Sequence, residues 1–492
     1  MQKTTVRVQP LVRVFALLPI EDLWRLAVCR DWVHAVDVVR RAWRSIPSRM
    51  SYTPFTSLDR ALLRTNVRSL GGHSRLMVQA CLALPRADLA FDGRTHTCQE
   101  LLCDCSPFLR FEDVFRLLCG PMRMHLLRHN PDLCASFIRG LEPGALARLV
   151  PFLLSSHTAS QRRFVHDVVA PICARERTTA YALYFSGNQD VKDALWRHLH
   201  ALLRRDLQQT LSMMQAIEAR LAGIVTRIAD ARCPFDPDVI IRNIVSVRQL
   251  ASSSRPYLVE LETSEGRMCV LIKSESLWND QLAMVCGWSL CCLGVHVPLY
   301  RVFPTETGGW IEILPGKTVY RLETSILNHI LRDAHRTVHD IRMEYVDYLV
   351  GFAMFGYVLG LGDRHLENIM VDGTKLFHID FSFLLGRDPK LSSAHMRLLP
   401  GMIEALGSYY DVFLDRLKNA YASVRTQADF YYCLFTHLGC ADRAQTHVRE
   451  RLRPASLDEE AALVIEHVVK HNSGDWRDRL GDLTHSMFKM EY

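Results

Sequence analysis

This chain of 492 residues has few cysteines that could pair, little net charge and few long apolar runs. Each of these features argues against one class of protein. The 15 cysteines follow no disulfide-like spacing, and "CDC" (103–105) and "CC" (291–292) are too close together for a zinc ribbon. We therefore expect free thiols in a reducing compartment, most of them buried as small apolar side chains.

The net charge of +6 is mild and spread along the chain. It is too mild to argue for nucleic acid as a partner, and no such partner is expected, but it suits a weak attraction to anionic lipid. The stretch "MQKTTVRVQPLVRVF" lacks the continuous apolar core of a signal peptide. Apolar residues make up 49% and charged residues 23%, which is typical of a globular protein with a substantial core.

Two apolar runs approach the length of a membrane span, at residues 282–300 and 348–362. Both border polar motifs that must meet in one site, and insertion into a bilayer would hold those motifs apart. We therefore expect both runs to form buried helices of the core.

Residues 1–230 carry the pattern of a helical protein. Apolar residues recur three and four positions apart, as in 21–43, 145–154 and 193–225, and breakers such as "LEPG" (141–144) separate the segments. Because no fixed repeat period is visible, we expect an irregular helical array.

The pattern changes near residue 233. Two β-rich runs, 257–263 and 267–273, flank the turn "SEG" and predict a hairpin. Another strand is expected at 309–314, and "IMVDGTKLFHIDF" (369–381) predicts a second hairpin with Asp-Gly as its turn. With helices between and after these strands, we expect a small sheet-rich lobe followed by a larger helical lobe.

Polar features then follow one another in an order that suggests phosphoryl transfer. The turn "ASSSRP" (251–256) offers N–H groups and the hydroxyls of Ser252, Ser253 and Ser254 to phosphate oxygens, although most such turns are only turns. Lys273 ends an apolar strand, from which a lysine either extends to solvent or points into a cleft toward phosphate.

The stretch "GLGDRHLENIM" (360–370) places Asp363, His365 and Asn368 just beyond a buried helix. Histidine suits general base catalysis near neutral pH, and Asn368 offers a neutral oxygen to a hard cation. Asp363 alone would equally well cap a loop. Asp380 ends an apolar strand, where a charge is costly unless it binds something, and magnesium is the natural ligand. A kinase site is favoured because all five residues occur together in this order along the chain: Lys273, Asp363, His365, Asn368 and Asp380.

These loops, "GDRHLENIM" and "KLFHIDF", resemble the catalytic and metal-binding loops of the phosphatidylinositol 3- and 4-kinase superfamily. Ordinary protein kinases carry H-R-D where this chain has D-R-H. The resemblance covers residues 233–492 and extends weakly to about 105. Further stretches narrow it to the phosphatidylinositol 3-kinases, most closely class III: "PFDPDV" (234–239), "SLWNDQL" (276–282), "LLGRDPK" (384–390), "MRLLPGMIEALG" (396–407) and "YYDVFLDRLKNAY" (409–421).

The resemblance implies an α+β fold, with a two-lobed protein-kinase-like catalytic domain preceded by an all-α helical region of the PIK type. The expected boundaries are a helical region over 1–100, a helical accessory domain over 101–230, a kinase N-lobe over 231–320 and a C-lobe over 321–492.

The resemblance also implies ATP and Mg²⁺, or Mn²⁺, as cofactors. Asp363, Arg364 and His365 would be catalytic, with His365 as the base on an inositol hydroxyl. Asn368 and Asp380 would bind the metal. The nucleotide would lie against Ser252, Ser253, Ser254, Lys273 and its acidic partner Asp280, Glu312 and Leu314 of the hinge, and Met370 and Ile379 beneath the adenine.

Departures from the family pattern lie close to this site. Ser382 stands where the family has the glycine of D-F-G, and a serine restricts the backbone. Trp278 and Asn279 replace Arg-Gln, and the spacing from Lys273 to Asp280 is one residue short. Because no metal ligand or base is altered, we expect an active enzyme. The alternative is a degraded kinase that acts as a scaffold.

The substrate can be inferred from charge. The segment 382–400 carries only Arg387, Lys390 and Arg397 as strong cations. A head group with extra phosphates would need a dense basic cluster, so three scattered cations suit unphosphorylated phosphatidylinositol. The class III resemblance implies the same substrate, with phosphatidylinositol 3-phosphate as product. A 4-kinase or a related protein kinase is the alternative.

Both ends of the chain carry weaker signals. Residues 15–45 resemble an F-box, which would bind a ubiquitin-ligase adaptor, and a helix pair of the array is the alternative. Residues 475–492 predict an amphipathic helix that contacts either membrane or the C-lobe. The resemblance further implies regulatory protein subunits and a cytoplasmic enzyme, peripheral on endosomal or other internal membranes, in trafficking or autophagy signalling.

Overall fold

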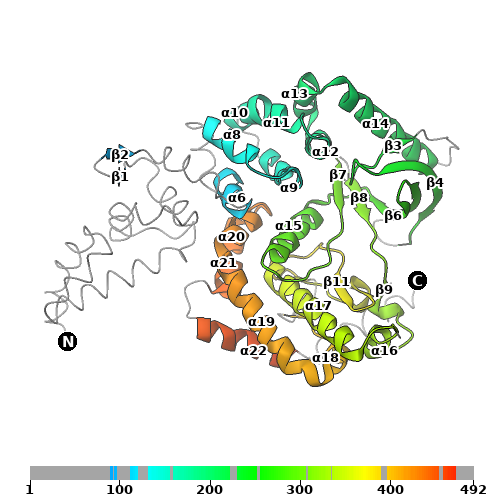
Figure 1. Ribbon diagram of the computed structural model, residues 1–492, viewed down its shortest axis with the longest axis vertical. Helices are drawn as coiled ribbons and strands as arrows, with labels where there is room; N and C mark the ends of the chain where they lie inside the picture. Colours follow the sequence, from blue (N-terminus) through cyan, green and yellow to red (C-terminus); the bar gives the residue numbers. More distant parts are fainter. Residues whose placement is uncertain are drawn as a thin grey trace. The chain divides into compact units, whose positions relative to one another are not determined.

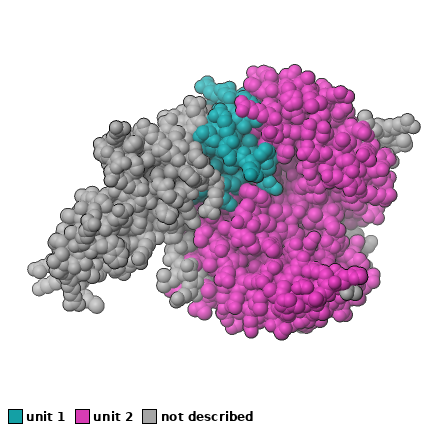
Figure 2. Space-filling view, viewed as in Figure 1, with its two compact units in different colours: residues 1–172 teal, residues 173–492 magenta. Residues whose placement is uncertain are grey.

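The computed structural model describes residues 89–91, 94–96, 111–119, 131–155, 159–221, 230–251, 255–305, 308–333, 335–388, 396–453 and 458–472. The F-box-like segment, Ser252 to Ser254, Lys390 and the C-terminal segment 475–492 lie outside these residues. The chain divides into two compact units, residues 1–172 and 173–492, which Figure 2 shows in two colours.

The described residues of the first unit are mainly helical, as their apolar spacing predicts, apart from two short paired strands that were not predicted. Phe115 packs edge-on against Phe152, with 5.1 Å between ring centroids, and both rings are fully buried. The elements run to the start of the second unit in the order β1 (Leu89–Phe91), β2 (Arg94–His96), α6 (Phe111–Cys119), α8 (Pro131–Arg139), α9 (Pro143–Leu154), α10 (Ala159–Phe164), the π-helical turn η5 (Val165–Val169) and α11 (Ala170–Cys173).

Three helices open the second unit: α12 (Arg177–Ser186), α13 (Gln189–His198) and α14 (Ala201–Leu221). Asn188 caps α13, because its side-chain oxygen accepts the N–H of Val191 at 3.1 Å. The apolar pattern predicted over 193–225 is interrupted at Leu199, whose extended backbone ends α13 before α14 begins.

An antiparallel sheet follows, in the order β3-β4-β5-β6-β8-β7. The hairpin predicted around "SEG" is confirmed, with Thr263 paired to Gly266 across the turn. Three strands of this sheet were not predicted: β3 has only two residues, β4 carries two register shifts that break its alternation, and β7 contains Pro304. The strands are β3 (Ala231–Arg232), β4 (Ile240–Gln249), β5 (Tyr257–Thr263), β6 (Gly266–Lys273), β7 (Val302–Thr305) and β8 (Gly308–Glu312).

Helix α15 (Trp278–Cys292) connects this sheet to the helical lobe. It contacts β7 on the sheet side and α17 (Val338–Leu359) and α20 (Ala428–Thr436) on the other, an arrangement visible in Figure 1. The two apolar runs therefore form the buried helices α15 and α17, as predicted. Among the described residues, no helix combines the length and apolarity needed to cross a bilayer.

The helical lobe is built around α17, which contacts α19 and β11. The predicted Asp-Gly hairpin is confirmed as β10 and β11, with Gly373 in the left-handed region at φ +54°. The remaining elements are β9 (Lys317–Thr318), η6 (Val319–Arg321), α16 (Ile326–Ile330), η7 (Leu366–Asn368), β10 (Ile369–Asp372), β11 (Lys375–His378), α18 (Pro400–Leu406), η8 (Gly407–Tyr409), α19 (Tyr410–Arg425), α21 (Ala441–Leu452) and α22 (Asp458–Asn472).

Candidate active site

The two glycines of "GLGD" let two chain segments touch. Gly360 ends α17 at φ +58°, and a Cβ there would lie 2.4 Å from the His447 ring. A Cβ on Gly362 would lie 2.0 Å from the carbonyl oxygen of Arg387. The N–H of Gly362 donates to the carbonyl of Phe383 at 3.1 Å. The catalytic loop is therefore pressed directly against the segment that follows the metal-binding loop.

Asp363 and His365 lie together just beyond the C-terminal end of α17, where the sequence predicted them. Asp363 has φ +49°; its N–H donates to Asp388 Oδ2 at 3.0 Å, and its carbonyl accepts from Asn368 Nδ2 at 3.0 Å. His365 Nε2 lies 3.9 Å from Asp363 Oδ2, and the two side chains are 12% and 27% exposed. A carboxylate and an imidazole are thus held side by side within reach of solvent.

Arg364 is buried and contacts backbone. Its guanidinium donates to the carbonyls of Gly362, Ile379 and Asp380, the first two at 2.8 Å. Burial lowers the pKa of Arg364, against the opposing charge of Asp380. These bonds join the catalytic loop to the metal-binding loop, so Arg364 holds the two loops in register.

Asn368 and Asp380 are brought to one end of the β10–β11 hairpin by its register, because Ile369 pairs with His378. Asp380 has φ +62°, and its Oδ1 accepts the N–H of Ser382 at 3.1 Å and the Ser382 hydroxyl at 2.6 Å. Burial raises the pKa of Asp380, but the Ser382 hydrogen bonds and nearby cations more than offset it, so the pKa lies below its usual value.

One carboxylate and one amide oxygen are hard donors that fit Mg²⁺ held jointly with nucleotide phosphates. Within the described part of the chain, no cluster of three or more His, Cys, Asp or Glu residues forms a metal centre by itself. The donor set at Asn368 and Asp380 therefore suits a cation that arrives with ATP.

Lys273, at the end of β6, is held by carboxylates. Its Nζ lies 3.0 Å from Glu275 Oε1, and its side chain is only 12% exposed. Burial lowers the pKa of Lys273, but Asp280, Glu275 and Asp380 together raise it above its usual value. Asp280 itself is buried and accepts a hydrogen bond from the Tyr300 hydroxyl at 3.1 Å. The lysine is thus a fixed positive charge inside the site.

The predicted hinge follows β8. The Glu312 carboxylate is bound by Arg301, whose backbone N–H, Nε and Nη2 donate at 2.9, 3.0 and 2.8 Å. The backbone N–H of Glu312 donates to the carbonyl of Arg301 at 2.9 Å, so neither the carboxylate nor this N–H is directed at a nucleotide. Within the part of the chain that the structure describes, no carbonyl accepts the N–H of Leu314. Met370 lies nearby on β10, paired with Thr318.

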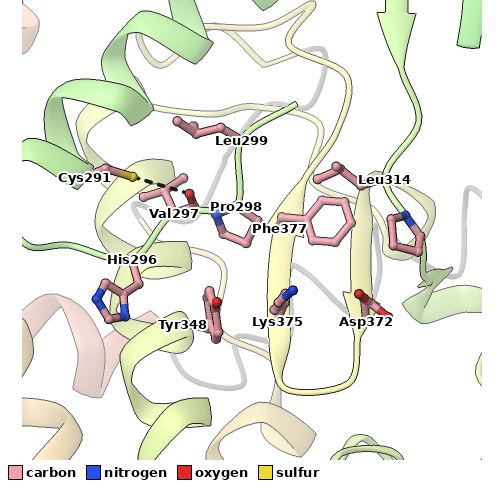
Figure 3. Close-up of a pocket in the computed structure, with 11 residues that line it drawn as sticks. Cys291, His296, Val297, Pro298, Leu299, Leu314, Tyr348, Asp372, Lys375 and Phe377 are labelled. Carbon is pink, nitrogen blue, oxygen red and sulfur yellow. Dashed lines mark hydrogen bonds between the residues drawn. The ribbon is translucent and has the colours of Figure 1, made fainter. Parts of the chain in front are cut away.

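A cavity of about 400 Å³ opens behind this hinge (Figure 3). It shares Leu314 with the hinge, but Met370 and Ile379 do not line it, so it is distinct from the predicted adenine floor. Its walls are Cys291, His296, Val297, Pro298, Leu299, Leu314, Pro315, Tyr348, Asp372, Lys375 and Phe377.

The predicted substrate cations differ in their placement. Arg387 is exposed, whereas Arg397 is 8% exposed and flanked by buried Met396 and Leu398. Arg397 therefore does not present its charge on the surface, and its role toward substrate stays a prediction. Of the three predicted cations, only Arg387 is described as surface-exposed.

Sequence reasoning did not single out Asp388 and Tyr300. Asp388 binds the backbone of Asp363, and Tyr300 binds the carboxylate of Asp280. Both contacts join segments more than ten residues apart, which no local pattern reveals. The only available signals were an acidic residue in "LLGRDPK" and a tyrosine that closes the apolar run "HVPLY".

Comparison with known proteins agrees with this geometry. Residues 322–447 match the family "Phosphatidylinositol 3- and 4-kinase". A region of 257 residues is 30% identical to "Phosphatidylinositol 3-kinase VPS34" of Arabidopsis thaliana, and 28% identical to "Phosphatidylinositol 3-kinase, root isoform" of Glycine max, covering 46% of this chain and 31% of each relative. Against "Phosphatidylinositol 3-kinase VPS34" of Saccharomyces cerevisiae, identity is 26% over 300 residues, covering 52% of this chain and 33% of the relative.

The matched region thus spans about a third of the length of these relatives. The family match over residues 322–447 includes the catalytic loop and the β10–β11 hairpin that ends at the metal-binding loop. Residues 322–447, which contain the catalytic loop and the metal-binding hairpin, are thus similar to the catalytic domain of phosphatidylinositol 3- and 4-kinases.

Proposed function

We propose that this chain is a lipid kinase that transfers the γ-phosphate of ATP to the 3-hydroxyl of phosphatidylinositol, giving phosphatidylinositol 3-phosphate. The observation that carries the proposal is the meeting of Asp363 and His365 with the hairpin end that bears Asn368 and Asp380. The similarity to proteins named phosphatidylinositol 3-kinases supports the choice of substrate and position.

Each residue then has a role in the transfer. His365 accepts the proton of the inositol hydroxyl as its oxygen forms a bond to the γ-phosphorus, while the bond from that phosphorus to the bridging oxygen of ADP breaks. Lys273 binds phosphate oxygens, and Leu314 offers its N–H to adenine. Asn368 and Asp380 would hold Mg²⁺, which supplies positive charge to the phosphates when bound.

Surface charge supports an unphosphorylated head group. With Arg397 buried, the described part of the segment after Asp380 offers fewer surface cations than its composition suggests. A head group with additional phosphates would need several of them. The proposal extends to action at the surface of internal membranes, with regulatory protein subunits, in trafficking or autophagy.

Radiolabelled phosphate transfer to each phosphoinositide in vesicles, with Mg²⁺ or Mn²⁺, tests the proposal. We expect label only on phosphatidylinositol, at the 3-position. His365→Ala should lower the rate at least about a hundredfold, because the general base is lost. The matched control is His335→Ala, which changes an exposed histidine outside the site. Near-parental rates for His365→Ala would refute the base assignment, and label at the 4-position would refute the regiochemistry.

The alternative is a degraded kinase that acts as a scaffold, and Ser382 in place of glycine is the observation that favours it. A scaffold should bind ATP with Mg²⁺ weakly or not at all. Calorimetric titration of the full chain with a nonhydrolysable ATP analogue and Mg²⁺ therefore separates the two functions.

A further inference from the structure

Two residues that depart from the family pattern meet at the metal-binding loop. Asn279, in the first turn of α15, donates from Nδ2 to the carbonyl of Phe381 at 3.1 Å and lies 3.5 Å from the carbonyl of Ser382. Ser382 in turn binds the side chain of Asp380. The departures are therefore adjacent in space, although 103 positions separate them in the chain.

Ser382 fixes one oxygen of the Asp380 carboxylate. Oδ1 accepts both the backbone N–H of Ser382 at 3.1 Å and its hydroxyl at 2.6 Å. A glycine at this position could supply only the backbone bond. With Oδ1 held by two donors, the carboxylate loses rotational freedom and Oδ2 is the oxygen left for a cation.

Asn279 fixes the backbone of the same loop from the side of the sheet-rich lobe. Its anchorage is firm, because the preceding Trp278 donates from Nε1 to the carbonyl of His437 at 3.0 Å. Phe381 is fully buried and lies edge-on to Phe355, with 5.7 Å between centroids. The loop is thus held by an amide from α15, by a buried ring and by the serine hydroxyl.

We propose that Ser382 and Asn279 are positioning residues for the divalent cation, which hold Asp380 with Oδ2 directed at the metal. This rests on the proposed function only in that Asn368 and Asp380 bind the cation. Hydrogen bonds that orient a metal ligand typically contribute 10- to 100-fold in metal affinity. Ser382 therefore stabilises the metal-binding geometry of Asp380. A glycine at this position would give the loop backbone more conformational freedom.

Mn²⁺ binding to the full chain with a nonhydrolysable ATP analogue, followed by the electron paramagnetic resonance signal of free Mn²⁺, tests this without catalysis. We expect Ser382→Ala to weaken Mn²⁺ binding about tenfold. Ser382→Thr, which keeps the hydroxyl, should restore it. Asn279→Ala should weaken binding several-fold, and its effect should shrink in a Ser382→Ala background, because both act on Asp380.

Ser246→Ala is the matched control. Ser246 also binds a carboxylate, that of Glu260 at 3.3 Å, but at an exposed position of strand β4 outside the site. Its loss should leave Mn²⁺ affinity unchanged. Ser382 is itself exposed, and melting curves without metal will show that its variants fold.

The outcomes are distinct. Unchanged or tighter Mn²⁺ binding in Ser382→Ala would overturn the inference, since the hydroxyl would then be neutral or compete with the cation. Failure of Ser382→Thr to restore binding would also overturn it. If the parental chain with the analogue binds no Mn²⁺, the cation site of the proposed function fails as well.

Discussion

Asp280 lies in the first turn of α15 and is 6% exposed, so its charge is costly to the folded chain. Burial raises its pKa from 3.8 to about 6, despite the opposing effects of Lys273 and the Tyr300 hydroxyl. Asp280→Asn removes the charge, while the remaining carbonyl oxygen can still accept from Tyr300. The substitution should therefore remove a pH-dependent loss of folding stability. It should also deprive Lys273 of the nearby negative charge of Asp280.

The size of this cost follows from the raised pKa. The folded state keeps its proton to a higher pH than the unfolded state, so stability falls as pH rises from about 4 to about 6. Each pKa unit corresponds to about 1.4 kcal/mol, which gives a cost of about 3 kcal/mol at pH 8. At pH 5 roughly half of this cost has developed. The benefit of Asp280→Asn should thus be larger at pH 8 than at pH 5, by roughly half of the full cost.

Urea unfolding of the full chain at both pH values measures this difference. The unfolding transition of the kinase region is identified as the one whose midpoint moves to higher urea when an ATP analogue is added. Comparing the two pH values cancels any pH-independent cost of burying an amide. Asp333→Asn is the control, because Asp333 is exposed and its side-chain oxygen accepts the N–H of His335. A benefit that is equal at pH 5 and pH 8 would refute the reasoning. The affinity for ATP should fall in the same variant, since Lys273 loses the nearby negative charge of Asp280 and keeps its ion pair with Glu275.

Two further substitutions test how the loops are held. Gly362→Ala should abolish phosphate transfer and lower the melting temperature, because the added Cβ would lie 2.0 Å from the carbonyl oxygen of Arg387. Gly401→Ala is the control: its Cβ would have no neighbour nearer than 3.7 Å, so the activity and the melting temperature should stay unchanged. Arg364→Lys should cost about 3 kcal/mol of stability in urea unfolding and most of the activity, since the single nitrogen of an ammonium cannot reach three carbonyls that Nε, Nη1 and Nη2 bind separately. Full activity in either loop variant would contradict the assigned geometry.

The features predicted from the sequence are those with a local signal. The Asp-Gly turn and alternating apolar residues predicted the β10–β11 hairpin, and the polar burst after an apolar run predicted where α17 ends. Asp363, His365 and Asn368 lie within six residues, so any fold of the loop keeps them close. Asp380 joins them because hairpin register is itself a local property.

The remaining features depend on contacts between distant segments. The irregular pairing of β4 with β5 hid that strand, and the burial of Arg397 depends on packing that its own neighbours do not specify. The bond from Asp363 to Asp388 and the contact of Asn279 with Phe381 likewise depend on tertiary structure. The sequence marked Asn279 and Ser382 as separate departures, and only the fold shows that they share a loop.

Cys291 places a thiol, which a covalent compound can modify, in the wall of the cavity behind the hinge. Its thiol lines the cavity and lies 3.5 Å from the carbonyl of Val297, whereas the adjacent Cys292 is exposed and is not among the lining residues (Figure 3). A thiol-directed compound shaped to the apolar walls would press on Leu314 without entering the nucleotide site. Because the proposed function has Leu314 donate its N–H to adenine, such a compound would weaken ATP binding from outside the nucleotide site, and its selectivity would depend on Cys291.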